Sequence, residues 1–265
     1  MVLSALGIWS APALAQGVIL ESHHCLNGCP IGPAGVTKLV DRHIYILANN
    51  PETKFAEWVA YEVRADWFGP TRKRSWRRDP WLDASETLEP KDYTGANAAL
   101  KTDRGHQAPL ASFAGTPYWH ETNYLSNITP QGSGLNQGPW VDLETATRDL
   151  AAAVPDGRVH VITGPLYERE MAALPQADEP HAVPSGYWKI VVLRERDRTR
   201  AATFVFPQEV PRSDEHCAAI YRGTIGDIEA RAGITLFPTM GAATRVALET
   251  DGGLAAVLGC ANKPS

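Results

Sequence analysis

The stretch TDRGHQAPLAS, residues 102–112, places an arginine and a histidine on either side of a single glycine. In an extended segment alternate side chains point the same way, so Arg104 and His106 are expected to share one face. A guanidinium binds anions, and an imidazole with an ordinary pKa of about 6.5 accepts a proton near neutral pH. This pair suits an anionic substrate whose attack requires a base.

A second group of polar residues follows in NYLSNITPQGSGLNQGPWVDLE, residues 123–144, which contains Asn123, Asn127 and Asn136 and ends at Glu144. Asparagine is common in turns and caps, so a structural role is the simpler interpretation of each one taken alone. A histidine followed by an asparagine at a helix N-terminus also fits a base beside a metal site. Amide and carboxylate oxygens suit Mg²⁺, which keeps most of its waters and needs few protein ligands.

A helix is predicted within residues 138–157, because apolar residues recur at helical intervals and Pro139 suits a first turn. If Asn136 and Glu144 both lie on this helix, they share one broad side but are ~12 Å apart along its axis. That separation favours Asn136 as the direct metal ligand and Glu144 as the acceptor from a coordinated water, since a Mg²⁺–oxygen bond is only ~2.1 Å.

The remaining pattern predicts an α+β fold with a central, mostly antiparallel sheet. A second helix is expected at 224–233, where Thr224 and Asp227 form a capping box and Gly233 a stop. Residues 64–100 are expected to be irregular, and the absence of repeats and linkers favours a single domain over 16–265. Runs of β-branched and aromatic residues predict strands at 43–49, 54–63, 157–167, 187–194 and 201–207.

The overall charge gives little sign of a polyanion-binding surface. The chain has 265 residues, of which 44% are hydrophobic and 21% charged, and its formal net charge is −5. Any anion site must therefore be local. The strongest local candidate is TRKRSWRR, residues 71–78, although such a run taken alone is more typical of a solvated basic loop.

The first fifteen residues are apolar and end in Ala13-Leu14-Ala15, the pattern of a secretory signal peptide cleaved after Ala15. No later stretch is long and apolar enough to span a bilayer. The mature protein is therefore predicted to be secreted or periplasmic, with no membrane partner.

Four cysteines stand at positions 25, 29, 217 and 260, an even number in a chain predicted to be exported. Disulfides are the default there, and the natural pairing is Cys25–Cys29 and Cys217–Cys260. The alternative is a metal site at HHCLNGC, residues 23–29. Zinc sites usually combine two such clusters, and no second one follows, so disulfides are favoured.

Three of these segments, DRGHQAPLAS, NYLSNITPQ and LNQGPW, resemble the signature of the DNA/RNA non-specific endonuclease family. The likeness spans nearly the whole mature chain. It also takes in NGCP, KFAEWVAY, RSWRRDP, DYTGANAAL, TGPLYER and LGC.

The resemblance implies a ββα-metal fold, in which a hairpin supplies the histidine and the following helix supplies the metal ligand. It implies that His106 is the general base, that Asn136 binds Mg²⁺ directly, with Mn²⁺ able to substitute, and that Glu144 holds a metal-bound water. The implied activity is Mg²⁺-dependent hydrolysis of single- and double-stranded DNA and RNA to 5′-phosphorylated products. Family analogy also allows a homodimer.

The same resemblance assigns Arg74 and Arg104 to contacts with the scissile phosphate and Asn127 to ordering of the site. Asp103 is interpreted as structural support for the loop that carries His106. Two alternatives stay open: a nucleic-acid-binding protein without catalysis that uses residues 71–78, and a phosphodiesterase restricted to small esters.

Overall fold

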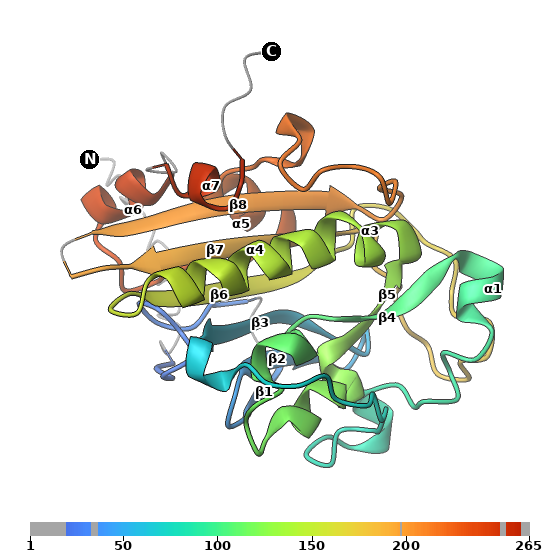
Figure 1. Ribbon diagram of the computed structural model, residues 1–265. Coiled ribbons are helices and arrows are strands. Elements are labelled where there is room, and N and C mark those ends of the chain that lie inside the picture. Colours follow the sequence, from blue (N-terminus) through green and yellow to red (C-terminus); the bar gives the residue numbers. More distant parts are fainter. Residues whose placement is uncertain (1–19, 33–36, 197, 250–252, 261–265) are drawn as a thin grey trace, which may run out of the picture.

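A computed structural model describes residues 20–32, 37–196, 198–249 and 253–260 (Figure 1). The expected signal peptide, residues 1–15, lies outside the described residues. A six-stranded sheet in the order β1-β2-β3-β6-β7-β8 forms the centre, and every neighbouring pair is antiparallel. Its strands are β1 (Lys38–Asp41), β2 (Ile46–Asn50), β3 (Phe55–Val63), β6 (Arg158–Leu166), β7 (Gly186–Arg194) and β8 (Thr199–Pro207).

The predicted antiparallel α+β architecture is thus confirmed, and the five predicted strands correspond to β2, β3, β6, β7 and β8. Only β1 in this sheet was not predicted. It has four residues, and only Val40 among them is buried, so it carries too little apolar alternation to be read from sequence.

The central sheet is buried on both faces because its strands alternate apolar side chains between two cores. Leu47, Val59 and Val191 point to one core, whereas Trp58 and Ile190 point to the other. In Figure 1, α4 lies across one face of the sheet. The first core includes α4 (Pro139–Ala153) and α7 (Leu254–Val257), and the second includes α5 (Ile225–Ala232) and α6 (Ala242–Glu249).

Both predicted helices are confirmed. Pro139 begins α4, which buries Trp140 and Leu143 against the sheet. In α5, Thr224 and Asp227 form the reciprocal capping box, and Gly233 ends the helix in the left-handed region at φ 66°.

A separate two-stranded antiparallel ladder carries the histidine segment. It pairs β4 (Thr102–His106) with β5 (Ile128–Gly132), so that His106 lies opposite Ile128. The strands are joined by residues 107–127, which include α2 (Leu110–Phe113) and the 3-10 turns η3 (Trp119–Asn123) and η4 (Leu125–Asn127). The short helix α3 (Ser133–Gln137) and then α4 follow β5, giving the order strand, strand, helix.

Residues 64–100 are largely irregular, as expected. They contain only the 3-10 turns η1 (Ala65–Trp67) and η2 (Ala84–Glu86) and the short helix α1 (Ala96–Leu100). Elsewhere in the chain, one further 3-10 turn, η5 (Ala219–Tyr221), follows β8. The irregular segment is anchored by a buried ion pair between Arg42 and Asp79, and Arg42 also lies 4.4 Å from the centre of the Tyr124 ring. Asp79 accepts a second hydrogen bond from Ser126 at 2.6 Å. This network fixes the end of the basic run 71–78 against the chain that leads into β5.

Both predicted disulfides are present, Cys25–Cys29 and Cys217–Cys260. Because Cys25 and Cys29 are joined in a disulfide, they offer no thiolate to the alternative metal site at residues 23–29. The Nε2 atom of His24 is hydrogen-bonded to the carbonyl oxygen of Arg42 at 2.8 Å. Within the described ranges, the structure contains no helix with the length and apolar character needed to cross a bilayer.

Candidate active site

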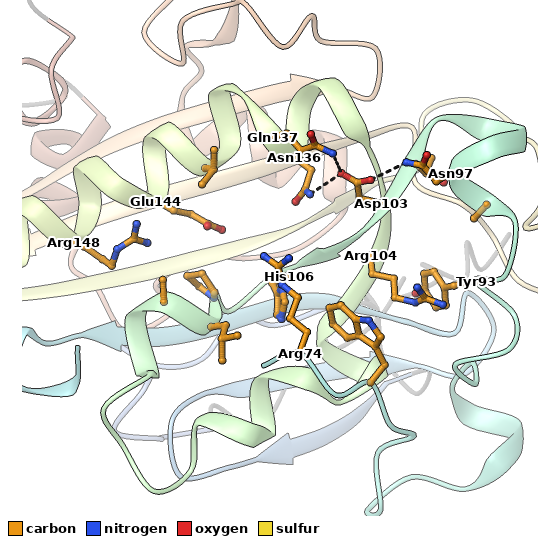
Figure 2. Close-up of a pocket in the computed structure, with 17 residues that line it drawn as sticks. Arg74, Tyr93, Asn97, Asp103, Arg104, His106, Asn136, Gln137, Glu144 and Arg148 are labelled. Carbon is orange, nitrogen blue, oxygen red and sulfur yellow. Dashed lines mark hydrogen bonds between the residues drawn. The ribbon is translucent and has the colours of Figure 1, made fainter. Parts of the chain in front are cut away.

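A cavity of about 510 Å³ lies where β4, α3, α4 and the basic run 71–78 meet (Figure 2). Five of the six predicted site residues line it, and Asn127 does not. The polar residues and aromatic residues of its wall are Arg74, Trp76, Tyr93, Asn97, Thr102, Asp103, Arg104, His106, Asn136, Gln137, Glu144 and Arg148.

His106 is the last residue of β4 and is only 8% exposed. Its Nε2 atom has no hydrogen-bond partner, and its ring lies 5.2 Å from the ring of Trp76. Burial, together with the nearby Arg74 guanidinium, lowers the pKa of His106 to about 3, while the adjacent Asn123 amide opposes this shift. The imidazole is therefore neutral at physiological pH, with a nitrogen free to accept a proton.

Gly105 lets the two strands of the ladder approach closely beside His106. A Cβ atom at this position would lie 2.4 Å from Oε1 and 2.6 Å from Cβ of Gln131. A glycine beside the histidine favours a close approach of the chain and an exposed loop; the close approach is present, whereas the segment is not an exposed loop. Both Gly105 and His106 are buried in a strand, because the pairing with β5 covers them.

Asp103 gathers four side-chain hydrogen bonds on the helical side of the cavity (Figure 2). Asn97 and Ser133 donate to Oδ1 at 3.0 and 2.9 Å, and Asn136 and Gln137 donate to Oδ2 at 3.0 and 2.7 Å. Burial raises the pKa of Asp103, but these hydrogen bonds outweigh it, and the pKa is lowered overall.

This carboxylate therefore supports a different part of the site from the one expected. The side chains that donate to it lie on α1 and α3, not on the segment that carries His106. Because the Asn136 nitrogen donates to Asp103, the opposite atom of the amide, the oxygen Oδ1, remains for a ligand. Asp103 thus fixes which end of the Asn136 amide can bind a cation.

Asn136 and Glu144 lie on two helices, and the expectation of one continuous helix is wrong. Asn136 is on α3, and Glu144 is on α4, with Gly138 as the break between them. A Cβ atom on Gly138 would lie 2.4 Å from the carbonyl oxygen of Arg212, so the chain passes too close for a larger residue. The estimate of ~12 Å along a single axis does not apply. Figure 2 shows the Asn136 amide and the Glu144 carboxylate directed into the same cavity.

Lys189 supports Glu144 from the sheet beneath it. Its side chain is 1% exposed, and its Nζ lies 3.4 Å from Glu144 Oε1 and 3.8 Å from the centre of the Trp140 ring. Burial lowers the pKa of Lys189 to about 8, and the Glu144 carboxylate opposes that shift. The ammonium group thus compensates the charge of Glu144 at the cavity wall. Sequence reasoning missed this residue, although a lysine inside the apolar run YWKIVVLR was a usable signal.

We expect Lys189→Met to lower both metal affinity and kcat/KM by roughly 10–100-fold, the usual effect of losing a group that orients a ligand. Calorimetric titration of the nucleic-acid-free protein with Mg²⁺ measures the first quantity, and initial rates measure the second. Lys91→Met, which removes an exposed lysine paired with Asp178, is the control and should change neither. Unchanged metal binding in a folded Lys189→Met protein would show that Lys189 has no such role.

The arginines of the cavity occupy two distinct settings. Arg104 donates to the carbonyl oxygen of Pro90 at 3.0 Å and lies between the rings of Trp76 and Tyr93, at 5.8 and 5.2 Å from their centres. Arg74 instead approaches His106, where its charge acts on the imidazole. The predicted alternation does bring Arg104 and His106 to one cavity, but the guanidinium whose charge lowers the pKa of the imidazole is that of Arg74, from the basic run.

Arg148 also lines the cavity and was missed from sequence. It follows Glu144 by four residues on α4, so its side chain lies on the same helical face. That spacing within the predicted helix was the signal that could have found it.

Asn127 lies behind the cavity and is fully buried. Its Nδ2 donates to the carbonyl oxygens of Ala108 and Thr122, both at 2.9 Å, and its Oδ1 accepts from the Ala108 nitrogen at 2.8 Å. These bonds fix the chain two residues after His106. These hydrogen bonds support the predicted role of Asn127 in ordering the site, although Asn127 does not line the cavity.

The donor set of this cavity fits a hard divalent cation. The free Asn136 oxygen and the Glu144 carboxylate are both oxygen ligands, and the volume leaves room for waters. The four cysteines are all in disulfides, so no thiolate competes.

A two-stranded ladder that ends in a buried histidine, followed by a helix with oxygen ligands and flanked by arginines, defines a ββα-metal nuclease. Comparison with known proteins agrees. The family model for DNA/RNA non-specific endonuclease matches residues 24–243. The chain belongs to this family, whose members are metal-dependent nucleases, and it is an endonuclease.

Individual relatives cover most of the chain. It is similar to the nuclease of Serratia marcescens, with 44% identity over 253 residues and 94% of each chain covered. It is also similar to mitochondrial endonuclease G of Homo sapiens, with 28% identity over 79% of this chain and 72% of that protein. A crystal structure of the EndoG/EndoGI complex shares the fold, with a TM-score of 0.67 and 22% identity over 79% of this chain and 89% of that one.

Proposed function

We propose that this protein hydrolyses phosphodiester bonds in single- and double-stranded DNA and RNA, leaving 5′-phosphate ends, with Mg²⁺ at Asn136 and Glu144. Mn²⁺ is proposed to substitute. One observation carries the proposal: a neutral, buried imidazole with a free nitrogen shares a cavity with an amide oxygen whose orientation is fixed by Asp103.

His106 would accept the proton of the attacking water, because its Nε2 is free and its burial keeps the ring uncharged. Arg74 and Arg104 would bind the oxygens of the scissile phosphate through charged hydrogen bonds. A bound Mg²⁺, held directly by Asn136 and through a water by Glu144, would supply charge neutralisation at the phosphate. Asp103 and Lys189 would hold those two ligands in position.

Broad substrate use follows from this chemistry. The nucleophile is water, so the ribose 2′-hydroxyl has no chemical task and both DNA and RNA can be cut. Contacts from guanidinium groups to phosphates carry no sequence information, so cleavage is expected to be nearly independent of sequence.

A plasmid-nicking assay, run in parallel with a single-stranded RNA, tests the proposed activity against its two alternatives. The proposed nuclease converts supercoiled plasmid to nicked, linear and then short fragments and also degrades the RNA. A binding protein would only retard the plasmid band, and an enzyme restricted to small esters would leave it unchanged. Either of those outcomes would contradict the proposal.

The pH profile offers a separate prediction. A lowered pKa means that His106 stays unprotonated as the pH falls below 6.5 and is lost as a base only when the pH reaches its folded pKa. We therefore expect the acid limb of kcat/KM, measured at saturating Mg²⁺, to lie below pH 6.5. Arg74→Gln removes a cation that lowers this pKa, so its acid limb should shift to higher pH.

The acid limbs of the wild type and of Arg74→Gln are measured in the same buffer series. The test uses only the pH at which each limb falls, so a lower maximum rate of Arg74→Gln does not affect it. A wild-type limb at or above pH 6.5, or one that Arg74→Gln leaves in place, would contradict this electrostatic account of His106.

We also propose that the mature protein acts outside the cytoplasm, in the periplasm or after secretion, and that it can form a homodimer. The two disulfides support export, because such bonds persist in oxidising compartments. Light scattering of the purified protein measures the mass in solution and decides between monomer and dimer.

A further inference from the structure

A second cavity, of about 470 Å³, continues from the active site along α2. The two cavities share Arg74, Leu110 and Ala111, so they form neighbouring parts of one depression. One side of the second cavity comes from the segment with Thr71 and Arg72, and the other comes from the apolar surface of α2 and Ala114.

The chemistry of this cavity matches part of a nucleotide. Two guanidinium groups face an apolar surface of Leu110, Ala111 and Ala114, and its described lining contains no aspartate or glutamate. In the described part of the chain, neither Arg72 nor Arg74 forms an ion pair with a carboxylate. Such a surface accommodates a sugar or base against its apolar side and a phosphate against its arginines.

Arg72 is held in place before any ligand binds. Its Nε donates to the carbonyl oxygen of Ala114 at 2.8 Å, and its guanidinium carbon lies 5.5 Å from the centre of the Trp119 ring. The segment before it is fixed by two facing glycines, since a Cβ on Gly69 would lie 2.6 Å from the Gly115 Cα. The Nη atoms of Arg72 can therefore bind an anion at little entropic cost.

Arg72 and Arg74 are two residues apart, so their Cα atoms are separated by at most ~7 Å. Lys73 between them is exposed and lines neither cavity. The basic run thus directs alternate charges into the depression, which suits contacts to neighbouring phosphates of a single strand.

We propose that this cavity is a second nucleotide subsite, in which Arg72 binds the phosphate next to the scissile one and α2 supports the attached sugar or base. The subsite rests on the proposed nuclease function. It makes a nucleic-acid strand with at least two phosphates the preferred substrate over an isolated phosphodiester.

The test compares Arg72→Gln with Lys73→Gln, which removes the same charge one residue away. For duplex DNA, we expect Arg72→Gln to raise KM roughly tenfold, as for loss of one charged hydrogen bond, with kcat nearly unchanged. The slope of the logarithm of the DNA-binding constant against the logarithm of the salt concentration should become less steep by about 0.7–0.9. Lys73→Gln should match the wild type in both. Bis(p-nitrophenyl) phosphate, which has no neighbouring phosphate, should be hydrolysed equally by all three proteins.

Thr71→Glu provides a second variant that does not touch the Ala114 contact. It places a carboxylate at an exposed position of the same cavity and should also raise KM for DNA without changing hydrolysis of the small diester. If wild-type protein leaves DNA intact, the proposed function itself is wrong. If the wild type cuts DNA but Arg72→Gln and Thr71→Glu behave like Lys73→Gln, only the subsite is wrong.

Discussion

Replacing His106 with alanine is expected to lower kcat on DNA by about 100- to 10,000-fold, the range typical for removal of a general base. The imidazole is the proposed base because its Nε2 has no hydrogen-bond partner and because His106 lines the cavity that Asn136 and the arginines also line. Its ring also packs against Trp76, so a thermal melt must show that the variant is folded. Steady-state rates at saturating DNA and Mg²⁺ provide the measurement.

The matched control is His120→Ala. His120 is half-buried against the rings of Trp119 and Tyr124 but does not line the cavity, so its loss should leave kcat near the wild-type value. If His106→Ala retains activity within about tenfold of wild type, the histidine is not the base.

Asn136→Ala is expected to nearly abolish cleavage and to weaken Mg²⁺ binding measured by calorimetry without nucleic acid. The oxygen that Asp103 leaves free on this amide is the proposed direct ligand, and alanine has none. The control is Gln137→Ala, which removes another amide that donates to the same carboxylate and should be far milder. Asn136→Asp should not restore activity, because it replaces a donor to Asp103 with a second negative charge.

The same measurements of cleavage and Mg²⁺ binding distinguish the direct metal contact proposed for Asn136 from the water-mediated contact proposed for Glu144. Glu144→Gln keeps an acceptor and should be milder than Glu144→Ala, if Glu144 acts through a water. A metal-bound crystal structure with a Glu144 oxygen directly on the ion, and with Asn136 turned away, would reverse this assignment. Full metal affinity in Asn136→Ala would also contradict it.

The central sheet could be predicted because its strands are long and rich in apolar and aromatic residues. The runs around Trp58 and Ile190 carry this signal on both faces. The ladder of β4 and β5 gives no such signal, because TDRGH and ITPQG are short and polar. Its pairing depends on tertiary contacts such as the one that Gly105 permits with Gln131.

Most of the site residues could be named from their types and from the family resemblance, but their contacts could not. The role of Asp103 depends on donors from α1 and α3, which are separated by more than thirty residues in the chain. The single-helix interpretation failed at Gly138, since periodicity does not reveal a close approach to Arg212. Likewise, the basic run alone could not show that Arg72 and Arg74 enter cavities whereas Lys73 does not.

The most direct test of the central claim is digestion of DNA and RNA by the purified protein with Mg²⁺, with excess EDTA, and with Mg²⁺ restored. We expect both nucleic acids to be degraded in Mg²⁺, both reactions to stop in EDTA, and both to resume when Mg²⁺ is added back. Cleavage that continues at the full rate in excess EDTA, or no cleavage of either substrate in Mg²⁺, would contradict the account.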